Sequence, residues 1–186
     1  MAGIIRDFTG VANREVSDQH VPVSLEEELD RALATERTAA EMKGVVVNRS
    51  YQGNLRVMAL PDQLRQALAN LITNAVQAMK GAGTLTLTTT RSDHTGTVTI
   101  ADSGPGISKQ HLSKVFDPFF TTKEPGKGTG MGLPVSQSIM RDHGGEISLE
   151  SGSDGTRFFG RHGVVQRHLG PGIDLFEMRL GVRARD

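Results

Sequence analysis

Two asparagines and one aspartate are the side chains of this sequence best suited to binding a ligand. Asn70 and Asn74 lie one helical turn apart in the segment N-L-I-T-N-A. Their carbonyl oxygens suit a hard cation such as Mg²⁺ that keeps most of its water. Asp102 ends an alternating run in which Val98 and Ile100 share its side of a strand, so its carboxylate is expected to face inward. A buried carboxylate needs hydrogen-bond donors, and the exocyclic amino group of a base would supply one.

Two glycine-containing segments follow Asp102 in the sequence. Gly104 and Gly106 in D-S-G-P-G-I leave no side chain where the chain turns, so a flat ring could approach the backbone. The segment G-K-G-T-G-M-G-L then repeats glycine at alternate positions before an expected helix start, where free N–H groups attract phosphate. Lys123 and Lys127 add positive charge. The segment matches neither G-x-x-x-x-G-K-[ST] nor G-x-G-x-x-G.

Each motif also has an ordinary structural interpretation. Solvated asparagines are common on helices, a D-x-G turn often closes a strand, and a glycine-rich segment can be a flexible linker. The occurrence of all these motifs between Asn70 and Leu133, in one order, favours a ligand site.

Apolar periodicity indicates which elements must position these groups. Ser24 and Glu27 fit a capping box for a helix that runs to about Met42. Residues 45–48 and 55–59 are predicted to form two strands joined by a hairpin-like connection at 52–54. Asp62 is expected to cap the helix that carries both asparagines. The core face of that helix should consist of Leu64, Leu68, Leu71, Ile72, Ala75 and Met79.

The second half of the chain predicts a hairpin followed by a helix and a strand. Two runs alternate with period two on either side of S-D-H-T-G and end at Asp102. A helix should begin near Pro134 and end at Gly144-Gly145, before the strand E-I-S-L-E-S. The expected fold class is α+β: a two-layer α/β sandwich whose mixed, mostly antiparallel sheet has helices on one face.

Composition excludes several classes of function. The 186 residues contain 21 Lys+Arg and 21 Asp+Glu, so no net charge favours nucleic acid or an anionic membrane surface. The absence of cysteine excludes disulfides and thiolate chemistry. No run of 18 apolar residues is present, so we expect a cytoplasmic chain without membrane contact.

The motifs resemble the N, G1, F and G2 boxes of the ATP-binding catalytic domain (HATPase_c) of sensor histidine kinases, a branch of the GHKL superfamily. N-L-I-T-N-A, D-S-G-P-G-I, F-D-P-F-F-T-T-K (116–123) and G-K-G-T-G-M-G-L follow in that order. The resemblance covers residues 24–158 and implies the Bergerat ATP-binding fold. N-A-V-Q-A-M together with F-D-P-F-F-T-T-K is most similar to the nitrogen-regulation-like subtype.

The resemblance implies a role for each matching residue. Asn70 and Asn74 would be the catalytic residues and the Mg²⁺ ligands, and Asp102 would accept from the adenine amino group. Phe116 to Lys123 would anchor the ATP lid. The remaining ATP-binding residues would be Gly104, Gly106, Ile107, Phe119, Thr122, Lys123, Lys127, Gly128, Thr129, Gly130, Met131, Gly132, Leu133 and Thr156.

The implied function is transfer of the ATP γ-phosphoryl group to a histidine of a dimerisation hairpin, as part of a two-component phosphorelay with a response regulator. Hydrolytic relatives resemble this site but have Glu at the position of Asn70, and Asn cannot accept a proton from water. Two alternatives are a nucleotide-binding regulatory module, or degenerate kinase, without phosphotransfer, and an ATP-driven clamp of the gyrase kind, which Asn70 disfavours.

Both ends of the chain depart from the family pattern. None of the six histidines fits an acceptor on a helix, so the hairpin is expected to be absent and autophosphorylation alone is not expected. Residues 1–23 would be the end of the hairpin helix and a linker, before the catalytic domain at 24–158. In the atypical tail, 159–186, we expect an insertion at 159–175 and then an edge strand over 176–182.

Overall fold

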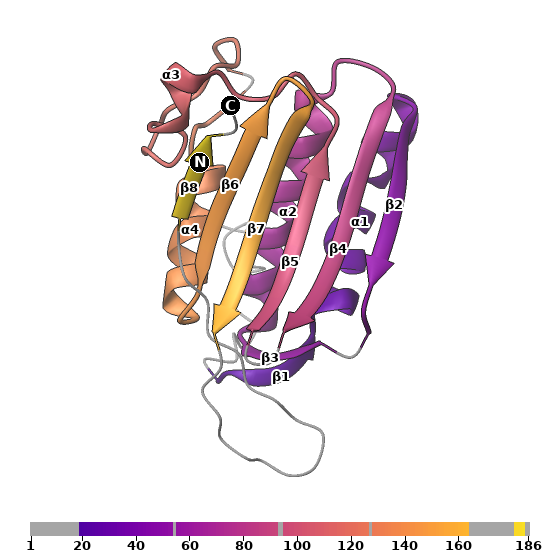
Figure 1. Ribbon diagram of the computed structural model, residues 1–186, viewed down its shortest axis with the longest axis vertical. Coiled ribbons are helices and arrows are strands. Elements are labelled where there is room, and N and C mark those ends of the chain that lie inside the picture. The colour runs from indigo at the N-terminus through magenta and orange to yellow at the C-terminus, as the bar shows by residue number, and fades with distance from the viewer. Residues whose placement is uncertain (1–18, 54, 93–94, 127, 164–180, 185–186) are drawn as a thin grey trace, which may run out of the picture.

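The computed structural model describes residues 19–53, 55–92, 95–126, 128–163 and 181–184, which form a two-layer sandwich of helices and one large sheet (Figure 1). Three helices cover one face of the sheet: α1 (Leu25–Met42), α2 (Pro61–Ala78) and α4 (Gly132–Asp142). The strands, in spatial order, are β2 (Val45–Tyr51), β4 (Gly83–Ser92), β5 (Thr95–Asp102), β7 (Gly155–Gly163), β6 (Glu146–Gly152) and β8 (Gly181–Ala184).

The sheet is mixed and mostly antiparallel, which confirms the expected fold class. The three central pairings, β4 with β5, β5 with β7 and β7 with β6, are antiparallel. The outer strands β2 and β8 each add in parallel. The predicted second hairpin is present, with Leu85 opposite Asp102, so the register brings Asp102 to the end of the sheet nearest the glycine segments.

The predicted first hairpin is wrong. β2 pairs in parallel with β4, and Gln52 N donates to Thr89 O at 3.2 Å as the chain leaves the sheet. β3 (Arg56–Ala59) instead pairs with β1 (Val21–Ser24) in a separate two-stranded sheet. Two apolar residues of β3, Val57 and Ala59, are buried there. The pairing of β3 with β1 and its burial in the core therefore override its closeness in sequence to β2.

The two long helices begin differently. The Ser24 hydroxyl accepts from Glu27 N at 3.4 Å, so the predicted cap of α1 is confirmed. The predicted Asp62 cap of α2 is wrong, since Leu60 is the N-cap and makes no side-chain bond. Pro61 opens α2 and has no N–H to satisfy. Asp62 instead pairs with Arg65 at 3.0 Å in the first turn.

The core forms between α2 and the sheet. The six predicted core residues of this helix segment, Leu64 to Met79, are buried, and Val98 and Ile100 of β5 are buried opposite them. α4 begins at Gly132, two residues before the predicted start, and ends before Gly144 as expected. No helix within the described ranges is long and apolar enough to cross a membrane.

The C-terminal part of the chain differs from expectation in the length of β7. The strand expected to break after Phe158 continues to Gly163, so the predicted insertion does not begin at residue 159. β8 lies at the sheet edge beside β6, and its residues 181 and 182 belong to the predicted edge strand 176–182, of which 176–180 lie outside the described residues. The expected helix end at residues 1–13 and the segment 164–180 lie outside the described residues.

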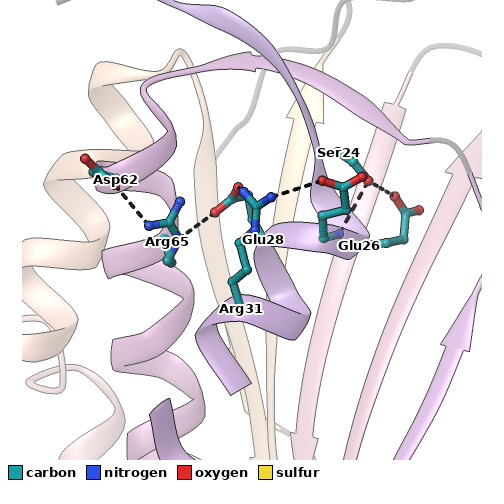
Figure 2. Close-up of polar contacts among 7 residues, drawn as sticks. Ser24, Glu26, Glu28, Arg31, Asp62 and Arg65 are labelled. Carbon is teal, nitrogen blue, oxygen red and sulfur yellow. Dashed lines mark hydrogen bonds and ion pairs between the residues drawn. The ribbon is translucent and has the colours of Figure 1, made fainter. Parts of the chain in front are cut away.

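A buried carboxylate joins α1 to α2. Glu28 is 2% exposed, and its two oxygens accept from Arg31 of the same helix at 2.7 Å and from Arg65 of α2 at 2.8 Å (Figure 2). Asp62 continues the chain of charges by pairing with Arg65. Since α2 carries both asparagines of the site, this network fixes the helix that positions them.

A buried histidine closes α4 at its C-terminus. His143 Nε2 accepts from Leu60 N at 3.0 Å, so Nδ1 carries the proton and donates to Ile139 O at 2.7 Å. Burial lowers the pKa of His143, the Ile139 carbonyl opposes that shift, the nearby His20 lowers it further and Asp142 raises it. The neutral ring therefore ties the end of α4 to the start of α2.

We expect acid to weaken this tie. Because the folded-state pKa is below the unfolded value of about 6.5, the contribution of neutral His143 is complete above pH 6.5 and is lost as the pH falls through the folded-state pKa. Urea unfolding at pH 7.5 and 5.5 should show a larger loss of unfolding free energy in the wild type than in His143→Gln. An equal loss in both proteins would contradict the prediction.

Candidate nucleotide site

A cavity of about 720 Å³ opens between α2, the end of β5 and the glycine-rich segment. It is the size of a small-molecule site. The predicted residues that line it are Asn70, Asn74, Asp102, Gly106, Ile107, Thr122, Lys123, Gly128, Thr129, Gly130, Gly132, Leu133 and Thr156. Segments distant in sequence thus meet in one place.

The two asparagines project from α2 into this cavity. Asn70 Nδ2 donates to Gly132 O at 3.2 Å and to Ser136 Oγ at 3.3 Å, which ties α2 to the first turn of α4. These bonds turn the Asn70 carbonyl oxygen away from α4. Asn74 Oδ1 accepts from the Lys123 ammonium at 3.4 Å. The Asn74 carbonyl oxygen already faces a positive charge, so it is suited to be a ligand of a metal cation.

Asp102 is 6% exposed at the end of β5. Burial raises the pKa of its carboxyl group, and hydrogen bonds from the backbone N–H groups of Gly104 and Thr156 oppose that rise. The bond from Gly104 N to Oδ1 is 2.8 Å. The backbone of the chain itself therefore supplies two of the donors that this buried carboxylate needs. Two carboxylate oxygens have about four acceptor positions, so capacity remains for a ligand donor.

The glycines of D-S-G-P-G-I are required by the packing of their own loop as well as by the shape of the cavity. Gly104 is not among the lining residues, and a Cβ there would lie 2.7 Å from Asp102 Oδ1. Gly106 has φ +73°, and a Cβ there would lie 1.9 Å from Gly152 O. Both positions exclude a side chain because the backbone is packed against its neighbours. Gly106 still lines the cavity, as predicted.

Phe119 lies outside the cavity. It adopts φ 66° and its side chain is 75% exposed. Its N–H donates to Gly130 O at 3.1 Å, which closes the base of the loop between Phe119 and Gly130. Phe120 lines the cavity instead and packs against His111, with ring centroids 5.5 Å apart. We predicted that Phe119 would line the cavity, but it adopts a left-handed conformation and is exposed, and the neighbouring Phe120 lines the cavity.

Other differences from the predicted residue set are small. Met131 does not line the cavity but is the N-cap residue of α4, and Lys127 lies outside the described residues. Ten lining residues were not among the predicted ATP-binding residues, although Phe120 and Thr121 fall within the expected lid anchor: Thr73, Gln77, Ala78, Ser108, His111, Val115, Phe120, Thr121, Gly126 and Phe158. Thr73, Gln77 and Ala78 carried a usable signal, because each lies three or four residues after one of the asparagines on the same helix.

The donor set suits a metal that takes most of its ligands from elsewhere. Within the part of the chain that the structure describes, no three His, Cys, Asp or Glu side chains cluster as a metal site. Asn70 and Asn74 offer two neutral oxygens, which fits Mg²⁺ completed by water and phosphate oxygens.

A two-layer sandwich with an inward carboxylate, paired helix asparagines and a glycine-rich loop around one cavity defines an ATP-binding domain of the GHKL type. Residues 59–162 match the family described as histidine kinase-, DNA gyrase B-, and HSP90-like ATPase, which is more than half of the chain. The chain belongs to this family.

Similar proteins narrow the class to sensor histidine kinases. Sporulation kinase A of Bacillus subtilis (strain 168) is 38% identical over 123 residues, 65% of this chain and 20% of that protein. Sensor histidine kinase ZraS of Salmonella typhi is 43% identical over 100 residues, 52% of this chain and 20% of that protein. This chain thus spans about a fifth of the length of these relatives.

A solved structure supports the same class. The catalytic domain of histidine kinase ThkA matches with a TM-score of 0.70 and 28% identity, over 77% of this chain and 94% of that one. ThkA has also been solved in complex with the response regulator protein TrrA, where the TM-score is 0.66 at 26% identity, over 76% of this chain and 41% of that one. The chain has the fold of a histidine kinase catalytic domain.

Proposed function

We propose that this domain binds Mg-ATP and transfers the γ-phosphoryl group to a histidine on a dimerisation hairpin. The observation that carries the proposal is the meeting of Asp102, Asn70 and Asn74 at one cavity of about 720 Å³. These groups lie on separate elements, and the cavity is large enough for a nucleotide.

Base and phosphates would occupy opposite ends of the cavity. The Asp102 carboxylate accepts from the adenine amino group, with Ile107 and Thr156 beside the base. The phosphates lie against the first turn of α4, where Gly132 and Leu133 present free N–H groups. Thr122, Thr129 and Lys123 contribute further donors from the loop.

Mg²⁺ would be held by Asn74, with Asn70 one turn away. The metal, when bound, neutralises phosphate charge and orients the transferred group. Asn74 and Asn70 would position this metal through their amide oxygens. Asn70 cannot accept a proton, so the site favours delivery to an acceptor over activation of water.

The acceptor histidine and the partner proteins are part of the same proposal. The hairpin belongs to the same kinase, and a response regulator then takes the phosphoryl group, as the ThkA–TrrA complex supports by analogy. We place the domain in the cytoplasm with its substrate ATP. We also propose a nitrogen-regulation-like subtype, on the motifs alone. Residues 1–23, 24–158 and 159–186 remain our proposed hairpin end with linker, catalytic domain and tail.

Mixing the chain with its own kinase's His-bearing hairpin and radiolabelled Mg-ATP tests the proposal. We expect acid-labile, alkali-stable label on the hairpin, and none when its histidine is replaced by glutamine. ATP binding without label would identify a regulatory module. Steady-state hydrolysis without any hairpin would identify a gyrase-like clamp.

A further inference from the structure

Lys123, in the loop between Phe119 and Gly130, lies against two amides of α2. Lys123 Nζ donates to Asn74 Oδ1 at 3.4 Å and also to Gln77 Oε1. The two amides are three residues apart, so their oxygens converge on one ammonium group. Amide oxygens leave the positive charge of Lys123 unneutralised. Burial and the nearby Lys43 lower the pKa of Lys123.

The loop that carries Lys123 is closed on itself. The lid segment (119–126 and 128–131) is joined at its base by the bond from Phe119 N to Gly130 O. A Cβ on Gly128 would lie 3.0 Å from Lys123 Cδ, so the lysine stem lies along the backbone of the opposite arm. The contacts of Lys123 with α2 therefore position both arms of the lid segment together.

The Asn74 oxygen is also the one we assign to the metal. Mg²⁺ requires a ligand oxygen at about 2.0–2.1 Å. A divalent cation at that distance repels a neighbouring ammonium twice as strongly as a monovalent one would. Asn74 cannot hold both cations without this repulsion. Gln77, to which we assign no metal, can keep its hydrogen bond with the ammonium.

We propose that the Lys123 ammonium and a divalent cation alternate at Asn74, with Gln77 as the positioning residue that holds Lys123 there. The inference rests on the proposed Mg-ATP site. Metal binding displaces the ammonium from Asn74, so Gln77 becomes the remaining contact of Lys123 on α2 and the lid segment is held less firmly. Coupling of metal arrival to loosening of the lid segment is thus built into two neighbouring amides.

Calorimetric titration with ATP, in excess Mg²⁺ and in EDTA, tests the alternation. In EDTA, the Lys123 ammonium of the wild type partly substitutes for the metal at Asn74. We therefore expect Mg²⁺ to strengthen ATP binding at least threefold more in Lys123→Met than in the wild type. An equal or smaller gain in Lys123→Met overturns the alternation.

Hydrogen exchange without nucleotide tests the role of Gln77 separately. We expect amides of the lid segment to exchange at least fivefold faster in Gln77→Leu. They should be unchanged in Gln66→Leu, a matched change at an exposed position of the same helix. Unchanged exchange in Gln77→Leu overturns the positioning role.

The two failures are distinguishable. A wild type that binds no ATP, or binds it equally with and without Mg²⁺, overturns the proposed function and the alternation with it. A wild type that binds Mg-ATP, with the same metal gain in Lys123→Met, overturns the alternation alone.

Discussion

Replacing Asp102 with asparagine is expected to weaken ATP binding about 10- to 100-fold. In the wild type the carboxylate accepts from the N–H groups of Gly104 and Thr156, and it has acceptor capacity left for the adenine amino group. In the variant one oxygen becomes an NH₂ group. In either orientation of the amide, the new NH₂ group faces another donor, which is a backbone N–H group or the adenine amino group.

Titration calorimetry with Mg-ATP measures this loss of affinity. A parallel titration with Mg-ITP tests whether the loss concerns the amino group of the base. Inosine has a carbonyl oxygen where adenine has its amino group, so the wild type should prefer ATP and Asp102→Asn should narrow that preference. Asp154→Asn is the matched control, because its side chain is 63% exposed and it does not line the cavity. Equal ATP affinity in the wild type and Asp102→Asn would refute the base-recognition argument.

Replacing Glu28 with alanine is expected to lower the free energy of unfolding by about 3 kcal/mol. The change leaves Arg31 and Arg65 without the carboxylate that joins them (Figure 2). The arginine side chains are 56% and 31% exposed, so water recovers part of the loss and the effect lies at the low end for a broken buried pair. Since Arg65 lies on α2, the helix of Asn70 and Asn74 should also become less firmly placed.

Urea unfolding followed by circular dichroism measures the effect. Glu41→Ala is the control for an exposed ion pair of α1, its partner being Arg37 at 2.8 Å, and should cost less than about 1 kcal/mol. Glu28→Gln keeps the shape and should fall between the two. A loss in Glu28→Ala no larger than that in Glu41→Ala would show that the network contributes no specific stability.

Sequence patterns predicted the site well where one element carries the signal. The turn-to-turn spacing of Asn70 and Asn74 placed both on one face of α2, and the alternation of Val98, Ile100 and Asp102 placed the carboxylate inward. These inferences succeed because helix and strand periods are local properties of the backbone.

They failed where a residue's neighbours come from elsewhere in the chain. Residues 45–48 and 55–59 have strand patterns, but β2 pairs with β4 and β3 with β1. Phe119 and Phe120 are adjacent, yet Phe119 adopts a left-handed conformation and is exposed while Phe120 lines the cavity. Strand pairing and side-chain direction in a loop depend on contacts that a local pattern does not encode.

The sequence by itself determined the kinds of chemistry available: amide oxygens on a helix, an inward carboxylate and a glycine-rich helix start. The tertiary structure alone decided that Gly104 and Thr156 share the Asp102 carboxylate and that Gln77 and Asn74 share the Lys123 ammonium. The physical reason is that residue type and period are read along one segment, whereas hydrogen-bond partners are set by the packing of segments far apart in the chain.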